Sequence, residues 1–161
     1  PMSTLFVDTI NEKTSGNGVA IPGHVVQFAS NTEGGSISST STSFVASGAN
    51  ISFTPKYSNS KIIITAQSRR FNIYTANFIQ VKLMRDGATN VSVDGTEHSG
   101  YMRNDNSSSS NQISIPLSYM WQDAPGTTSA VSYEVYYRVS TGTGFMADGG
   151  GIQYYVMEIA Q

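Results

Sequence analysis

The sequence predicts an all-β protein, an antiparallel jelly-roll sandwich of about nine or ten strands with a short extended N-terminal arm. Apolar residues recur with a period of two, and no ten-residue window combines a helical stripe with helix caps. Ser and Thr together make up 39 of the 161 residues, whereas charged residues make up 12%. Turn signals follow one another about every 8–15 residues, which is typical of a sandwich.

Residues 1–23 are predicted to form the arm. Their apolar residues alternate briefly before and after a Gly-rich stretch, which predicts two short extended pieces that end at the Pro22–Gly23 turn. They carry too few apolar side chains to bury a core alone, so we expect the arm to attach to something else. The attachment residues would be Leu5, Val7, Ile10, Val19 and Ile21.

Residues 24–161 are predicted to form the jelly-roll domain. The alternation is cleanest in residues 112–122 and 130–140, and Asp86–Gly87 is the strongest hairpin signal. Residues 95–111 are expected to form a long polar excursion, and Gly142 and Gly144 to punctuate the chain before its last strand. Strands are expected at residues 24–30, 36–45, 51–54, 61–69, 78–85, 89–93, 112–122, 130–140 and 152–160.

Several strands are apolar on both faces, although a sandwich strand is ordinarily polar on one of them. In the last strand Tyr155, Met157 and Ile159 stand opposite a second apolar set, and Tyr136 and Met120 add to the second faces of two earlier strands. These five residues predict an interface with another copy of the chain. Scattered surface apolarity is the alternative.

The composition argues against several classes of function. The chain has no cysteine, and its net charge of −2 gives no cationic field for nucleic acid. No apolar run approaches the roughly 20 residues of a membrane span, so no membrane insertion is expected. His24 and His98 lie in segments without metal-ligand spacing, and catalytic and phosphate-binding motifs are absent. We therefore expect no catalytic residues, no metal and no cofactor, and a protein that is not an enzyme.

Glycan binding is the stronger hypothesis for recognition. Exposed aromatic rings beside polar side chains on loops suit sugar rings and their hydroxyl groups. Packing at the rim of the sandwich is the alternative for the two residues near a strand end, and a subunit contact is the alternative for Tyr101. The candidates are Tyr101, Arg103, Asn104 and Asp105 in the polar excursion, and Phe71 and Tyr74 near the strand end.

Two N-terminal stretches, residues 2–10 and 15–27, resemble the N-terminal segments of virion proteins of tailed bacteriophages, notably those that infect cyanobacteria. Residues 51–64, 83–87, 123–128 with Tyr133, and 157–159 are similar to a fibre-type domain of the same group. The resemblance implies a trimeric jelly roll similar to those of C1q and tumour necrosis factor. It also implies that the N-terminal segment attaches to the virion or interlocks the trimer.

From these observations we expect a bacteriophage virion structural protein, such as a short fibre, a fibre tip, a head fibre or a decoration protein. Its expected location is the virion, and its expected partners are two further copies of itself, other virion proteins and, if it recognises a host, surface polysaccharide. A cellular carbohydrate-binding module is the alternative. A glycosidase or lyase is disfavoured because the chain has only 11 acidic residues, several of them in turns.

Overall fold

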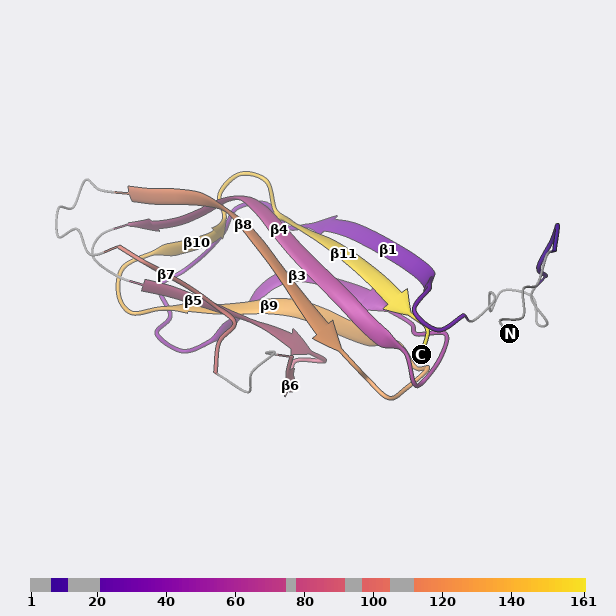
Figure 1. Ribbon diagram of the computed structural model, residues 1–161. Helices are drawn as coiled ribbons and strands as arrows, with labels where there is room; N and C mark the ends of the chain where they lie inside the picture. Colours follow the sequence, from indigo (N-terminus) through magenta and orange to yellow (C-terminus); the bar gives the residue numbers. More distant parts are fainter. Residues whose placement is uncertain (1–6, 12–20, 75–77, 92–96, 105–111) are drawn as a thin grey trace, which may run out of the picture.

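The computed structural model describes residues 7–11, 21–74, 78–91, 97–104 and 112–161. These residues form two antiparallel sheets packed face to face, which confirms the predicted all-β sandwich (Figure 1). No helix that could span a membrane occurs in these ranges. The strands are β1 (Val25–Glu33), β2 (Ile37–Ser39), β3 (Val45–Phe53), β4 (Lys61–Tyr74), β5 (Phe78–Arg85), β6 (Thr89–Asn90), β7 (Gly100–Arg103), β8 (Gln112–Asp123), β9 (Val131–Val139), β10 (Gly144–Ala147) and β11 (Ile152–Ile159).

The strand pairing is that of a jelly roll. Sheet A has the order β1-β11-β4-β10-β2, with β8 on the other side of β4, and sheet B has the order β3-β9-β5-β6, with β7 also paired to β5. The pairs are nested along the chain, because β1 pairs with β11, β3 with β9, β4 with β8, and β5 with β6 and β7. Successive pairs alternate between the two sheets, as they do in a jelly roll.

The core fills the space between the sheets with every second side chain of the long strands. Strand β9 alternates strictly between buried and half-buried residues, and in β11 every second residue is likewise buried. This is the period of two that the sequence predicts. The largest fully buried side chains are Trp121, Tyr133, Tyr137, Tyr154, Phe71, Ile62, Ile64, Ile73, Ile79, Leu83, Met146 and Ile152.

Tyr154 ties the two sheets together at an irregularity in β3. Residues 47–49 of β3 stand opposite Val135 alone, because the register between β3 and β9 shifts there. Gly48 takes the left-handed conformation with φ +77°. The Tyr154 hydroxyl, which comes from the other sheet, donates to the Ala49 carbonyl at 2.7 Å and accepts the Val135 N–H at 3.1 Å. A side chain thus satisfies backbone groups that the interrupted ladder leaves.

Several strand limits differ from the predictions. The polar strand expected at residues 36–45 is only β2, while β3 begins at Val45 rather than at residue 51. Strand β4 continues past residue 69 through a bulge. Strands β7 and β10 have four residues each. Strand β7 lies where the long polar excursion was expected, and β10 lies where Gly142 and Gly144 were expected to interrupt the strands.

The chain enters and leaves the domain at the same end of the sandwich, which we call the terminal end. The Gly23 N–H donates to the Ala160 carbonyl at 2.8 Å, and the Ala160 N–H donates to the His24 carbonyl at 3.0 Å. Of the predicted arm, residues 7–11 contain no strand, so the short strand expected around Val7 is wrong for that part. The opposite end, which we call the far end, carries the end of β4 paired with the start of β8, and the turn between β10 and β11 lies partway between the two ends (Figure 1).

Candidate functional site

The outer face of sheet A carries a continuous apolar surface near the terminal end, which we call the apolar patch. The register places Phe28 of β1 beside Met157 of β11, and Met157 beside Ile63 of β4. Phe28 is 58% exposed and Met120 is 68% exposed, which is high for side chains of this size. The patch consists of Val25, Phe28, Ile63, Met120, Tyr155, Met157 and Ile159.

The members of the apolar patch lie at neighbouring register positions rather than being scattered. The rings of Phe28 and Tyr155 stack with their centroids 6.2 Å apart. Tyr155 pairs with Thr65, which in turn pairs with Met120 on β8, so the patch reaches from the first strand of the sheet to the last. A contiguous apolar area of this kind on a soluble protein marks an interaction surface.

Four of the five predicted interface residues belong to the apolar patch: Met120, Tyr155, Met157 and Ile159. The fifth, Tyr136, lies on β9 of sheet B, between Ala46 and Lys82 on the neighbouring strands. It therefore points away from the other four, on the opposite face of the sandwich. Alternation along one strand identifies a second face, but it does not say which sheet the strand joins.

Sequence reasoning missed Phe28, Val25 and Ile63 as members of this surface. Phe28 could have been found, because it alternates with core residues in β1, and its neighbour Ala29 packs against the core. Ile63 sits inside a run of three isoleucines, where period two gives no contrast between the faces. Only the pairing with β11 places Ile63 beside Met157.

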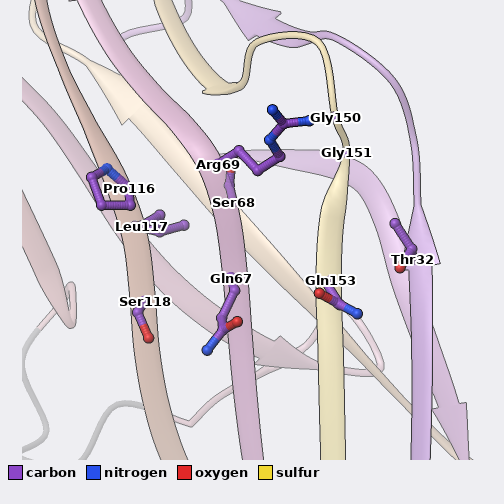
Figure 2. A pocket seen from close by; sticks show the side chains of 10 residues that line it. All are labelled: Thr32, Gln67, Ser68, Arg69, Pro116, Leu117, Ser118, Gly150, Gly151 and Gln153. Carbon is purple, nitrogen blue, oxygen red and sulfur yellow. The ribbon is translucent and has the colours of Figure 1, made fainter.

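The far half of the same sheet face is polar and hollowed. Thr32, Gln153, Gln67 and Ser118 pair directly across β1, β11, β4 and β8, which puts one polar side chain on each strand. They line a hollow of about 390 Å³ together with Arg69 and the backbone of Gly150 and Gly151 (Figure 2). This volume is within the range of small-ligand sites.

A bulge in β4 places Arg69 at this hollow. Ser68 pairs with Leu117 and Phe71 with Ile115, so Arg69 and Arg70 together stand opposite Pro116. Because proline has no backbone N–H to donate to the neighbouring strand, regular pairing is interrupted at Pro116, and β4 accommodates its extra residue there. Arg70 pairs with Asp148 at 3.3 Å, whereas Arg69 is exposed and has no ion pair or hydrogen bond to any other described residue.

The predicted glycan residues do not form one exposed surface. Tyr101 is 45% exposed, and Arg103 is exposed as well. Phe71 is 2% exposed and Asn104 is 3% exposed, so both belong to the interior, and Phe71 cannot offer a free ring face for stacking. Burial arises because β4 continues beyond its expected end and carries Phe71 between the sheets. Asp105 and the side chain of Tyr74 lie outside the described residues.

Tyr101 packs against its own neighbours in the edge region of sheet B. Its ring lies 5.4 Å from that of Phe78 and 6.1 Å from that of His98, measured between centroids. A small cavity of about 160 Å³ lies between Tyr101 and β8. Its lining includes Tyr119, Ile115 and Phe71. This cavity is less than half the size of the polar hollow on sheet A.

The outer face of sheet B carries a hydrogen-bonded network. Arg138 Nε donates to Gln80 Oε1 at 2.7 Å, and its Nη2 lies 3.2 Å from Glu97 Oε2. This fixes the Gln80 amide so that its Nε2 donates to His98 Nε2 at 3.2 Å. Lys82 and Arg138 both lie over the Phe44 ring, at 4.3 and 4.8 Å. These polar groups satisfy one another, which indicates a structural surface.

The buried acidic groups near the terminal end serve the fold. Glu158 is fully buried and accepts the N–H groups of Lys56 and Tyr57 at about 3.0 Å and the Gln27 amide at 2.6 Å. Burial alone raises the pKa of Glu158, but the donated hydrogen bonds lower it more, so its pKa lies below the ordinary 4.5. The carboxylate thereby joins β11 to the loop after β3.

A second acidic group links the two sheets. Asp123 accepts both hydrogen bonds of Arg85 Nη1, at 2.8 and 2.6 Å, and the hydroxyl of Tyr133 donates to it at 2.8 Å. Burial, followed by the Asp123 charge, raises the pKa of Tyr133 well above its ordinary value of 10.0. Within the described ranges, no group of three or more His, Asp or Glu residues could hold a metal ion.

Three of the predicted attachment residues fall within the described chain. Val7, Ile10 and Ile21 are 51%, 56% and 39% exposed, so none of them is used by the core of this domain. Leu5 and Val19 lie outside the described residues. A comparison with models of known protein families and a search of curated proteins both found no match.

Proposed function

We propose that the chain is a structural protein of a tailed-bacteriophage virion that assembles as a homotrimer through the apolar patch of sheet A. The observation that carries this proposal is the patch itself, in which Phe28 and Met120 are more than half exposed. Phe28 lies next to Met157 and Tyr155 on β11, and Met120 lies on the other side of β4, opposite Thr65. Covering the patch removes apolar surface from water, which stabilises the assembly by roughly 25 cal/mol for each Å² buried. The virion setting and the number three rest on the resemblance of the sequence motifs to phage fibre-type proteins.

The jelly-roll topology is consistent with this proposal. Sheet A presents β1, β11, β4 and β8 side by side as a four-strand face, and the apolar patch crosses all four strands. The face is continuous along one side of the molecule, so a neighbouring copy can cover it without rearrangement of the core. The exposed residues of the arm would attach the trimer to other virion proteins.

The test is the mass in solution of two matched variants. Tyr155→Lys places a charge within the apolar patch, whereas Tyr136→Lys makes the same change on the outer face of sheet B. The chain mass is 17.3 kDa, so the wild type and Tyr136→Lys should scatter as particles of about 52 kDa. Tyr155→Lys should shift the mass toward that of one chain. A wild-type monomer, or equal masses for both variants, contradicts the proposal.

Deletion of residues 2–22 separates the two roles of the arm. If the arm only attaches the protein to the virion, the shortened chain keeps the trimer mass. If the arm interlocks the subunits, the mass falls on deletion while the patch is intact. The alternative function, a cellular carbohydrate-binding module, corresponds to a monomer that binds glycan.

A further inference from the structure

We infer that the polar hollow on the far half of sheet A binds a short stretch of an acidic polysaccharide, with Arg69 holding a carboxylate. This deepens the proposed function, because it gives the trimer a ligand class and a site. The site is complete within one chain. It is formed by Thr32, Gln67, Arg69, Ser118 and Gln153 beside the glycine turn at residues 149–151.

The side chains around the hollow are not used by the fold. All five are exposed, and none of them makes a side-chain hydrogen bond or ion pair with another described residue. By contrast, Arg70, Arg85 and Arg138 each have an acidic partner. Five unpaired polar side chains around one hollow are typical of a site that takes its partners from a ligand.

The four side chains that pair across the strands, Thr32, Gln153, Gln67 and Ser118, form what we call the polar row, and its chemistry suits a sugar. Amides and hydroxyls both donate and accept hydrogen bonds, and sugar hydroxyls require both. Gln67 and Gln153 lie on adjacent strands, with Ser118 and Thr32 on the outer two (Figure 2). Because neighbouring strands are about 4.8 Å apart, the row spans roughly 14 Å across four strands. A linear ligand with hydroxyl groups along its length can lie across it.

Arg69 supplies the positive charge that a carboxylate ligand requires. A guanidinium binds a carboxylate through two parallel hydrogen bonds, and no acidic side chain of the described chain occupies that position. The stem of Arg69 lies over Gly150, where a Cβ would be 3.4 Å from Cδ, so the glycine turn gives it room. One such cation suits a carboxylated sugar better than a nucleic acid, which needs many phosphate contacts.

The hollow also lies away from the arm. It is beyond the apolar patch, near the ends of β1 and β11 that are farther from the terminal end, and β4 and β8 continue past it. A trimer attached through its arms would therefore hold the hollow on the side of the patch that faces away from the virion. Packing the far halves of three copies together would also bring Arg69 side chains near one another, and like charges repel. This half of the face is thus expected to stay open while the apolar patch is covered.

The test is calorimetric titration of the full chain with trigalacturonate and trimannuronate, two carboxylated trisaccharides, and with their methyl esters, which lack the charge. We expect one site per chain for at least one acid form and much weaker binding of its ester. Arg69→Gln should weaken binding roughly 10- to 100-fold, because a charged hydrogen bond is lost. Gln67→Ala should weaken it roughly 2- to 10-fold.

Matched controls lie on the same face. Lys61→Gln removes a positive charge from the outer face of β4, and Gln122→Ala shortens an exposed amide on β8, both near the terminal end. Both should bind as the wild type does. Binding that is lost equally in these controls, or equal binding of acid and ester, overturns the site. Absence of binding by either acid overturns it too.

The mass of each sample separates this inference from the proposed function. A trimer that binds no carboxylated trisaccharide contradicts the site and leaves the assembly intact. A monomer that binds, and loses binding on Arg69→Gln, contradicts the assembly and supports the site.

Discussion

Replacement of Tyr154 by phenylalanine isolates the contact that joins the two sheets. The ring stays in the core, where Tyr154 is fully buried, and only the hydroxyl is removed. That hydroxyl donates to the Ala49 carbonyl at 2.7 Å and accepts the Val135 N–H at 3.1 Å. Because β3 bulges at residues 47–49, no β3 group pairs regularly with Val135, and the variant leaves the Val135 N–H without this partner. The Ala49 carbonyl keeps a second donor, the Ser47 hydroxyl at 3.2 Å.

The magnitude follows mainly from the Val135 N–H, because the Ala49 carbonyl loses one of two donors. A buried polar group without a partner costs about 1–3 kcal/mol, and the variant no longer desolvates a hydroxyl, which offsets part of the cost. We expect the free energy of unfolding to fall by about 2 kcal/mol. For a chain of this size that corresponds to a decrease of roughly 4–8 °C in the melting temperature.

The assay is thermal and denaturant unfolding at a fixed protein concentration, since assembly makes the melting temperature depend on concentration. Tyr155→Phe is the matched control, because the same atom is removed from the next residue, on the outer face. It should change stability by less than about 0.5 kcal/mol. The role of the Tyr154 hydroxyl at the bulge is refuted if Tyr154→Phe has the melting temperature of the wild type. It is also refuted if Tyr155→Phe loses as much free energy of unfolding as Tyr154→Phe.

Further predictions concern three acidic groups. Because the pKa of Glu158 is below 4.5, its stabilisation is fully present above pH 4.5 and is lost as the pH falls through the lowered value. We therefore expect Glu158→Gln to have a free energy of unfolding about 2 kcal/mol below that of the wild type at pH 7. Between pH 7 and pH 3 the stability of the variant should fall less than that of the wild type. Parallel profiles of stability against pH for the two proteins would contradict this. Asp123→Asn breaks the enclosed pair with Arg85 and the Tyr133 hydrogen bond, so chemical denaturation should show a loss of about 3 kcal/mol. Glu97→Gln breaks an exposed pair with Arg138 and should cost less than about 1 kcal/mol; equal losses would show that burial does not govern these pairs.

Strands with strong alternation could be predicted from the sequence. The predicted limits of residues 78–85 coincide with β5, and those of 112–122 and 130–140 differ by about one residue from β8 and β9. The short strand β6 lies within the predicted residues 89–93, whereas the short strands β7 and β10 could not be predicted. Strands β7 and β10 each contain a glycine, and β10 is held in place by pairing with β2 and β4, which are distant in sequence.

The candidate site was predicted in part. The apolar second face of β11 and Met120 could be identified from alternation, because those strands show contrast between their faces. The placement of Tyr136 on the other sheet depends on the pairing of β9 with β3 and β5, which no local pattern encodes. The polar row has the same origin, since Thr32, Gln67, Ser118 and Gln153 are unremarkable polar residues until the register aligns them.

The most direct measurement of the central claim, that the apolar patch is covered by other copies, is the rate of methionine oxidation by dilute peroxide, read residue by residue in a mass spectrometer. Met120 is 68% exposed in one chain, whereas Met146 is fully buried, so the same sample supplies its own reference. We expect Met120 and Met157 of the wild type to react nearly as slowly as Met146, and Met120 to react quickly in Tyr155→Lys. Rapid oxidation of Met120 in the folded wild-type protein would show that the patch is not covered.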